Sequence, residues 1–378
     1  QEGLVGIRLI KSFVRGDYEE MRFEKRNQQL KEANLTAMKT MLLYTPLMTL
    51  ALNITTVVVV WSGGNMIVAG NMQVGDLTAF TNYIVQIMSS LTMLSIAFLN
   101  WARAIASFRR VGEVLDEKID LTDENAKHKD RAVCEGSVEF QNVSFRYYKN
   151  SPEWVIENIS FKLEAGKTLG IIGSTGSGKS TLVSMIPRLY DTDEGTVLVD
   201  GINVRDYGLK PLREGIGMVL QNNTLFSGSI TENLKWGDEH ADEKAVRKAA
   251  QNAQAAGFID SFKDGYRTRL EQSGNNVSGG QKQRLCIARA LLKCPKILIL
   301  DDSTSAVDTA TERAIREALH SEYKDMTKII IAQRIRSVMD ADEILVLDNG
   351  KTAGFGTHEQ LLADCPVSVS YTHLRAHE

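Results

Sequence analysis

Two long stretches without charge constrain the fold of this chain more than any other feature of its sequence. No Asp, Glu, Lys or Arg occurs in the 36 positions from 40 to 75, nor between Asp76 and Arg103. Each stretch contains a run, residues 41–61 and residues 77–101, that is long enough as a helix to cross a hydrocarbon core of about 30 Å. Buried helices of a soluble protein are the alternative, but two uncharged runs longer than about 18 residues favour membrane spans.

The charges that flank these runs predict their orientation. The connection at residues 62–75 carries no Lys or Arg. Basic residues instead precede the first run and follow the second: Arg8, Lys11, Arg15, Arg22, Lys25, Arg26, Lys31 and Lys39, then Arg103, Arg109 and Arg110. By the positive-inside rule both flanks are cytoplasmic and the short connection is outside. We therefore expect a multi-pass protein of the plasma membrane whose C-terminal part is cytoplasmic.

Polar side chains interrupt both apolar runs: Asn53, Thr55, Thr56, Asn82, Gln86, Ser89, Ser90 and Asn100. They are compatible with the lining of a path for a transported molecule, and equally with hydrogen bonds between neighbouring helices. The first forty residues read as a helix that continues the first span into the cytoplasm. Because the chain opens with Gln1 in the middle of this pattern, we expect a fragment that lacks its N-terminal part.

A glycine-rich loop carries the first chemical signal of the C-terminal part. "TLGIIG" reads as a buried strand and "KSTLVSMIPRLY" as a helix, and the loop between them matches G-x-x-x-x-G-K-[ST]. The glycines let backbone N–H groups surround phosphate oxygens, the lysine adds a positive charge, and the Ser180 hydroxyl can coordinate Mg²⁺. The residues predicted to bind a nucleotide here are Gly173, Ser174, Thr175, Gly176, Ser177, Gly178, Lys179, Ser180 and Thr181.

A second segment, "ILILDDSTSAVD" at residues 297–308, places two acids after an apolar strand. Asp301 ends that strand, at the edge where ligands bind in parallel α/β sheets, and is predicted to hold Mg²⁺. Asp302 follows it, where a glutamate would reach further toward an attacking water. The shorter side chain raises the question of whether this chain hydrolyses ATP by itself.

A third segment, "VSGGQKQR" at residues 277–284, predicts another phosphate contact. Its Ser-Gly-Gly-Gln opens an apparent helix, and the N–H groups of a helix N-terminus suit an anion. Two helix N-termini of one small domain cannot easily grip a single phosphate from opposite sides. We therefore expect two such domains to face each other, each offering its own segment to the other's nucleotide: Ser278, Gly279, Gly280 and Gln281.

Together these motifs resemble the nucleotide-binding domain of ATP-binding cassette (ABC) transporters, over residues 136–365. Residues 1–115 resemble the last two membrane helices of an ABC exporter half-transporter. The resemblance implies all-α transmembrane helices fused to an α/β P-loop NTPase domain with a helical subdomain. Residues 116–135 are then a charged linker, and the unpatterned tail at residues 366–378 is expected to be non-native.

The resemblance also implies roles for single residues. Tyr147 in "FRYY" would stack on adenine, and Gln221 in "VLQNNTLF" would sense Mg²⁺ and contact the membrane part. Asp302 takes the place of the family's catalytic glutamate, and Gln333 in "IIIAQRIRSV" that of its switch histidine. "EQSG" at residues 271–274 departs from the exporters' usual Gly-Glu-Arg-Gly, which puts the coupling contacts there in doubt.

The substitutions at 302 and 333 weaken catalysis for physical reasons. Aspartate is one methylene shorter than glutamate, about 1.5 Å of reach, and a displacement near 1 Å can lower a rate on the order of a hundredfold. A glutamine amide cannot take up or deliver a proton at neutral pH. We therefore predict one half of a heterodimeric exporter of drugs or lipid-like molecules. Its own ATP site is weakened, while residues 277–281 ("VSGGQ"), which match the signature segment of the family, complete the partner's site.

Two other interpretations fit the same residues: a homodimeric exporter with a slow but working site, and a regulatory ATP-binding subunit without turnover. A soluble ABC ATPase would have no use for two uncharged spans, and an importer normally keeps its cassette on a separate chain. The formal net charge of −3 offers no broad basic field for nucleic acid. The expected ligands and partners are ATP, Mg²⁺, a second half-transporter, the lipid bilayer and a small-molecule cargo.

Overall fold

The computed structural model describes residues 6–304, 306–333 and 335–364. It divides the chain into two compact units, Gln1–Lys118 and Ile119–Glu378. The tail predicted to be non-native, residues 366–378, lies outside the described residues, as does Ser305.

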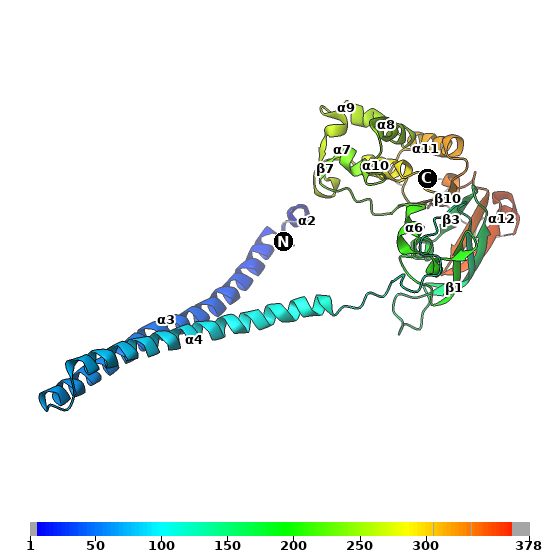
Figure 1. The fold of residues 1–378 in the computed structure, drawn as a ribbon. Coiled ribbons are helices and arrows are strands. Elements are labelled where there is room, and N and C mark those ends of the chain that lie inside the picture. Colours follow the sequence, from blue (N-terminus) through cyan, green and yellow to red (C-terminus); the bar gives the residue numbers. More distant parts are fainter. Residues whose placement is uncertain (1–5, 305, 334, 365–378) are drawn as a thin grey trace. The chain divides into compact units, whose positions relative to one another are not determined.

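The described part of the first unit is helical: α2 (Ile7–Ser12), α3 (Gly16–Val68) and α4 (Val74–Leu115). Helices α3 and α4 run antiparallel and pack against each other (Figure 1). Gly63 permits a close approach near the connection, since a Cβ there would lie 2.5 Å from a methyl carbon of Leu77. A capping box between Gln73 and Asp76 begins α4, so the short connection ends with its backbone N–H groups satisfied.

Both predicted spans lie within these helices. The segment Pro46–Val68 and helix α4 are each long and apolar enough to cross a membrane. The hydroxyls of the spans bond to their own helix, with Thr55 donating to the Ala51 carbonyl and Ser90 to the Gln86 carbonyl, each at 2.8 Å. These two hydroxyls are therefore satisfied without a neighbouring helix or a polar path.

The N-terminal helix predicted over the first forty residues is interrupted. Helix α2 ends at Ser12, and Val14 has a φ of 51°. A β-branched residue rarely adopts this left-handed conformation, so the chain changes direction before α3 begins at Gly16. Pro46 lies inside α3 and does not end it.

The second unit is an α/β domain with two larger sheets and one antiparallel pair of short strands. One sheet is antiparallel, in the order β2-β1-β4-β5; the other has the order β12-β11-β3-β10-β9-β6 and is parallel from β11 to β6. The third pairs β7 with β8. The strands are β1 (Val138–Phe145), β2 (Ile156–Leu163), β3 (Thr168–Gly173), β4 (Glu194–Val199), β5 (Ile202–Asn203), β6 (Ile216–Val219), β7 (Gly228–Ser229), β8 (Arg269–Leu270), β9 (Ile297–Asp301), β10 (Thr327–Ile331), β11 (Glu343–Asp348) and β12 (Lys351–Gly356).

Helices cover the parallel sheet and form a separate subdomain. The subdomain consists of α7, α8, α9 and α10, which lie together beside α11 in Figure 1. The helices of the second unit are α5 (Lys179–Ser184), α6 (Leu209–Glu214), α7 (Ile230–Lys235), α8 (Glu243–Asn252), α9 (Ala256–Ser261), α10 (Gly279–Leu292), α11 (Thr309–Glu322) and α12 (His358–Asp364). This arrangement confirms the predicted fold class.

The main core lies between the antiparallel and parallel sheets. Phe140 and Leu163 from one sheet meet Ile171 and Ile299 from the other, and each is at most 1% exposed. Every residue of β9 is buried, because helices and the second sheet cover both faces of the parallel strands. Because β9 is a buried central strand, the position of Asp301 at its end is well defined.

Candidate nucleotide site

One edge of the parallel sheet gathers the predicted phosphate and metal residues. Strands β3, β10, β9 and β6 are adjacent and parallel, so their carboxyl ends meet at the same edge. The phosphate loop follows β3, Asp301 ends β9, and Gln333 and Gln221 stand two residues beyond β10 and β6. Residue Ile331 pairs with Asp301 on one side and with Ile171 on the other. The sheet therefore brings together four segments that are far apart in sequence.

The loop from Gly173 to Thr181 has the backbone that phosphate binding requires. Gly178, just before α5, has a φ of 90°, and a Cβ there would lie 2.6 Å from a methyl carbon of Ile156 and 2.9 Å from the Val155 carbonyl oxygen. Only glycine adopts this conformation without strain and leaves room for those neighbours. The turn directs the loop into α5 at Lys179.

Helix α5 is shorter than the predicted helix through residue 190. It ends at Ser184, and the next turns are closed by i to i−3 bonds, including Arg188 N–H to the Met185 carbonyl at 3.0 Å. Pro187 explains the change, because it has no N–H for a helical bond and its ring disfavours helix in the preceding turn.

Lys179 holds its charge in the middle of the loop. Its ammonium donates to the carbonyl oxygens of Gly173 at 2.8 Å and Ser174 at 2.6 Å, and lies 3.4 Å from the Ser177 hydroxyl. Burial lowers the pKa of Lys179, while the carboxylates of Asp301 and Asp302 act in the opposite direction. The side chain is therefore preorganised to meet the outer phosphates of a nucleotide.

Asp301 and Ser180, the residues predicted to hold Mg²⁺, are in contact with each other. Asp301 is 4% exposed, and burial raises its pKa, opposed by a hydrogen bond from the Ser180 hydroxyl. A buried carboxylate and a hydroxyl in contact are hard oxygen ligands that fit Mg²⁺. Among the described residues, no group of three or more His, Cys, Asp or Glu side chains could hold a metal. A Mg²⁺ ion at Asp301 and Ser180 would take further ligands from phosphates, from water and, as the sequence predicts, from the side chain of Gln221.

Asp302 and Gln333 are in direct contact. The Gln333 amide nitrogen donates to Oδ2 of Asp302 at 2.7 Å. The backbone fixes this geometry, because Asp302 has a φ of 48° and its N–H donates to the Ile331 carbonyl at 3.1 Å. Residues 302 and 333, at which the catalytic glutamate and the switch histidine of the family pattern are replaced, therefore form one unit. Sequence analysis singled out both residues but did not predict the contact.

Tyr147 is anchored beside the phosphate loop. Its hydroxyl and that of Thr181 are 2.9 Å apart, within hydrogen-bond distance. Its ring packs edge-on against Phe145 and Tyr190, with centroids 5.1 and 5.3 Å away. The Tyr147 side chain remains half-exposed, which suits stacking on a base. Tyr190 was missed from the sequence, where a lone aromatic after the loop helix gave no signal.

The signature segment begins α10 and packs against the loop after β9. Ser278 and Gln281 form a capping box, in which Ser278 N–H donates to the Gln281 side chain at 2.9 Å and Ser278 Oγ accepts from Gln281 N–H at 3.3 Å. A Cβ on Gly280 would lie 2.8 Å from the Ala306 carbonyl oxygen. Buried Gln283, which sequence analysis did not select, accepts from the Ala306 N–H at 3.0 Å.

The signature segment and the phosphate loop each make local hydrogen bonds. In the described parts, no hydrogen bond or ion pair joins Ser278–Gln281 to Gly173–Thr181. Gln221 is exposed, and its side chain makes no hydrogen bond to another described residue. Its place at the end of β6 next to β9 is the geometry that a residue near a Mg²⁺ site needs.

The fold and this site define a P-loop nucleotide-binding domain, carried on the same chain as two helices fit to span a membrane. Comparison with known proteins extends this class to a family. Residues 1–91 match the ABC transporter transmembrane region, and residues 156–305 match the ABC transporter family. The chain belongs to the ABC transporter family and has the two regions of an exporter half-transporter. Its helices thus lie in the plasma membrane and its nucleotide-binding domain in the cytoplasm.

Individual relatives agree with this assignment. The chain is 42% identical over 364 residues to the ABC transporter ATP-binding protein YfiB of Bacillus subtilis, covering 96% of this chain and 62% of that protein. It is 39% identical over 379 residues to YgaD of the same organism, a putative multidrug export ATP-binding/permease protein, covering 99% of this chain and 63% of the relative. The chain therefore spans less than two thirds of the length of these relatives.

A solved structure is similar over the whole chain. It is that of a bacterial Atm1-family ABC exporter with ATP bound, with a TM-score of 0.90 and 30% sequence identity. The match covers 100% of this chain and 66% of the exporter chain. The helical unit and the nucleotide-binding unit thus both have counterparts in an ABC exporter.

Proposed function

We propose that this chain is one half of an ATP-driven exporter in which two nucleotide-binding domains face each other. Each ATP would lie between the phosphate loop of one domain and the signature segment of the other. The nucleotides would stabilise the closed pair by binding it more tightly than the open one, and the membrane helices would respond by opening outward. The cargo is a small molecule of the drug or lipid-like kind, a proposal supported by the similarity to YgaD.

We further propose that this chain's own ATP site is weak and that its partner is a different half-transporter. In the partner, a glutamate would follow the aspartate that ends the strand corresponding to β9, the Walker B strand of the family. The observation that carries this proposal is the 2.7 Å hydrogen bond from the Gln333 amide to the Asp302 carboxylate. An amide so placed satisfies one carboxylate oxygen but cannot exchange a proton with it. The shorter aspartate is therefore held near the strand end instead of reaching toward water.

The signature segment supports the other half of the proposal. Its capping box, which uses the N–H groups of Ser278 and Gln281, fixes the first turn of α10, a helix of 14 residues. The N–H groups of Gly279 and Gly280 lie between them and would meet an anion at this helix start. The contacts of Gly280 and Gln283 with Ala306 tie this helix start to the loop after Asp302. A sound signature next to a weakened Walker B acid is what a subunit needs if hydrolysis occurs on its partner's motifs.

The test is to restore the missing side chains in the assembled transporter. Asp302→Glu combined with Gln333→His should raise ATP turnover on the order of tenfold or more. The glutamate would bring a carboxylate closer to the attacking water, and the histidine would be able to take up and deliver a proton. Each single variant should give less than half of that gain, because the two side chains touch and their effects are coupled. Turnover per transporter at saturating ATP and Mg²⁺ is the measurement.

A matched control separates repair of the site from a general effect of the substitutions. Asp325→Glu with Gln251→His makes the same chemical changes at exposed positions and should leave turnover unchanged. If the double variant at 302 and 333 binds ATP but turns over no faster than the wild type, the weakened-site proposal fails. If the wild-type chain paired with itself hydrolyses ATP rapidly, a working homodimer replaces the heterodimer. If the repaired chain stays inactive with an active partner, a purely regulatory role is favoured.

A further inference from the structure

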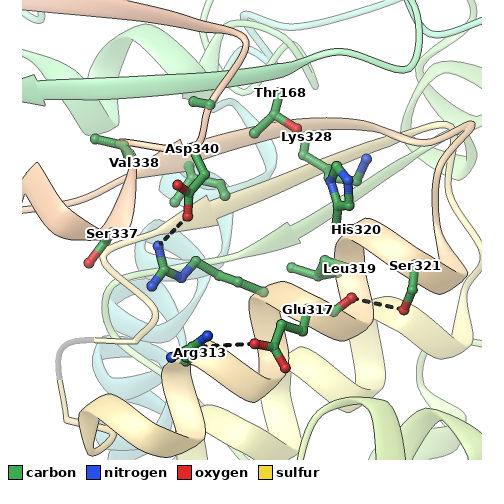
Figure 2. Close-up of a pocket in the computed structure, with 13 residues that line it drawn as sticks. Thr168, Arg313, Glu317, Leu319, His320, Ser321, Lys328, Ser337, Val338 and Asp340 are labelled. Atoms are coloured by element: carbon green, nitrogen blue, oxygen red, sulfur yellow. Dashed lines mark hydrogen bonds and ion pairs between the residues drawn. The ribbon is translucent and has the colours of Figure 1, made fainter. Parts of the chain in front are cut away.

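A second cavity lies on the nucleotide-binding unit, away from the phosphate loop. Its volume is about 760 Å³, and it lies between helix α11, strand β10 and the segment 337–341 (Figure 2). It reaches Thr168 and Lys328, near the beginnings of β3 and β10. The nucleotide residues follow the opposite ends of these two strands. The volume is in the range of cavities that hold small molecules.

Most charges in this cavity are already paired. Arg313 Nε lies 2.9 Å from the Glu317 carboxylate. Arg316 Nη1 lies 3.4 Å from the Asp340 carboxylate and donates to the Arg336 carbonyl at 2.8 Å. The two acids and the two arginines of the lining therefore compensate one another and leave no net charge.

Lys328 is the exception. Its side chain leaves β10 and turns toward the space beside α11, where His320 also points (Figure 2). The residue is only 5% exposed, yet its ammonium makes no hydrogen bond or ion pair to any described residue. Burial lowers the pKa of Lys328, opposed by the more distant carboxylates of Asp342 and Asp325.

The carboxylate of Asp342, which favours the charged form of Lys328, already has a donor on each of its oxygens. One oxygen of Asp342 accepts from Lys167 Nζ at 2.9 Å and the other from the Thr168 N–H at 2.8 Å. A second donor is also unsatisfied, since Arg316 Nε is buried without a hydrogen bond. Two donors of positively charged groups beside this cavity thus have no acceptor among the described residues: Arg316 Nε, which is buried, and the ammonium of Lys328. A buried donor such as Arg316 Nε normally has a partner.

We propose that this cavity binds a small organic anion, whose carboxylate or phosphate group pairs with the ammonium of Lys328. The rest of the ligand would be apolar, because Leu319, Ile330 and Val338 line the same space. The site is independent of the ATP site, since its residues lie toward the other end of the strands. An anion bound there would hold α11 in place. Because α11 begins directly after the loop that follows Asp302, binding of the anion would also affect the nucleotide site that we propose.

The experiment uses the full chain in lipid nanodiscs and three simple probes with one apolar ring: benzoate, phenyl phosphate and the neutral benzamide. Isothermal titration in saturating ATP measures their binding outside the nucleotide site. At least one anionic probe should bind the wild type, and benzamide should bind at least tenfold more weakly. Benzoate against phenyl phosphate then decides which head group the site takes.

Two lysines provide the matched variants. Lys328→Met removes the ammonium and keeps the length of the side chain, and it should weaken the anionic probe at least tenfold. Lys324→Met makes the same change at an exposed position nearby and should bind the probe as the wild type does. Without probe, Lys328→Met should unfold at a higher temperature than the wild type, which shows that the variant folds.

Three results would overturn the proposal. They are equal binding of the anionic probe by the wild type and Lys328→Met, equal binding of benzamide and benzoate, and no binding of either anion at millimolar concentration.

A second variant tests whether the effect of position 328 on probe binding is direct. Ser321→Trp places a bulky ring at the exposed edge of the cavity while keeping Lys328, and it should also reduce probe binding at least tenfold. Unreduced binding there contradicts the site.

Discussion

Lys179 shows how the phosphate loop prepares a charge before it is used. Two carbonyl oxygens and a hydroxyl surround its ammonium within 3.4 Å. These contacts hold the side chain against the loop. Two acids, Asp301 and Asp302, favour its charged form, whereas burial disfavours it. The residue is therefore a positioned charge whose protonation is more easily lost than that of a surface lysine.

Replacing this lysine should weaken ATP binding at this chain's site. Lys179→Ala removes a charge-assisted contact worth about 1.5–3 kcal/mol, or roughly a tenfold to hundredfold loss of affinity. Equilibrium binding of ATP with Mg²⁺ to the full chain is the measurement. Since burial lowers the pKa of Lys179, wild-type affinity should also fall as pH rises toward that lowered pKa, and the variant should lack this dependence.

The control for this prediction is Lys162→Ala, which removes an exposed lysine paired with Glu164 and should leave ATP affinity intact. In the assembled transporter, Lys179→Ala should leave part of the turnover, because hydrolysis is proposed to occur on the partner's motifs. Complete loss of turnover would instead indicate that this chain's own site is the catalytic one.

At the scale of elements, helix α10 and the loop after β9 are held together by direct contacts. The start of the helix touches Ala306 through Gly280, and Gln283 bonds to the Ala306 backbone. The same loop leads into α11, whose first turn is capped by Asp308. These contacts tie the start of the signature helix to Ala306 and so to the start of α11.

Two adjacent glycines test this contact. A Cβ on Gly280 would lie 2.8 Å from the Ala306 carbonyl oxygen, whereas a Cβ on Gly279 would lie 3.6 Å from the Ala306 Cβ. Gly280→Ala should destabilise the domain by about 1–3 kcal/mol through overpacking. Gly279→Ala should be neutral or slightly stabilising, because alanine is the better helix former. Thermal unfolding of both variants decides the matter, and equal melting temperatures would show that the contact does not constrain the helix.

The elements also show what a sequence can and cannot reveal. The strand before the phosphate loop, the strand ending in Asp301 and the helix after Gly280 were predicted, because each is marked by a local pattern. The Asp302–Gln333 bond was not, since it depends on the register of β9 against β10. The shortness of α5 was overlooked although Pro187 signals it. Lys328 gave no signal at all, because its isolation depends on how α11 packs.

At the scale of the whole molecule, some features of the membrane part could be predicted from the sequence and others could not. Charge-free length alone identified both spans, whereas the break at Val14 required a backbone conformation that no residue pattern announces. The facing of two nucleotide-binding domains remains a prediction from the signature segment. It is supported within this chain by the lack of any hydrogen bond or ion pair, in the described residues, between the segment and the phosphate loop.

The pairing predicts how the purified chain behaves. Alone in nanodiscs, it should bind ATP yet hydrolyse it at least tenfold more slowly than the transporter assembled with its partner half, because Asp302 and Gln333 cannot supply reach and proton exchange together. ATP binding and turnover measured on the same sample separate the two properties. As a control, phosphate release should disappear in both preparations when Mg²⁺ is removed by chelation. Equal rates with and without the partner would contradict the pairing.

The bond between residues 302 and 333 also restricts the redesign of this protein. Neighbouring strands hold both positions, so a glutamate introduced alone would press against the resident amide, and a histidine introduced alone would face a carboxylate too short for it. Neither single change can therefore give the full gain in turnover that is expected of the pair. A design that aims at rapid hydrolysis has to change both residues together.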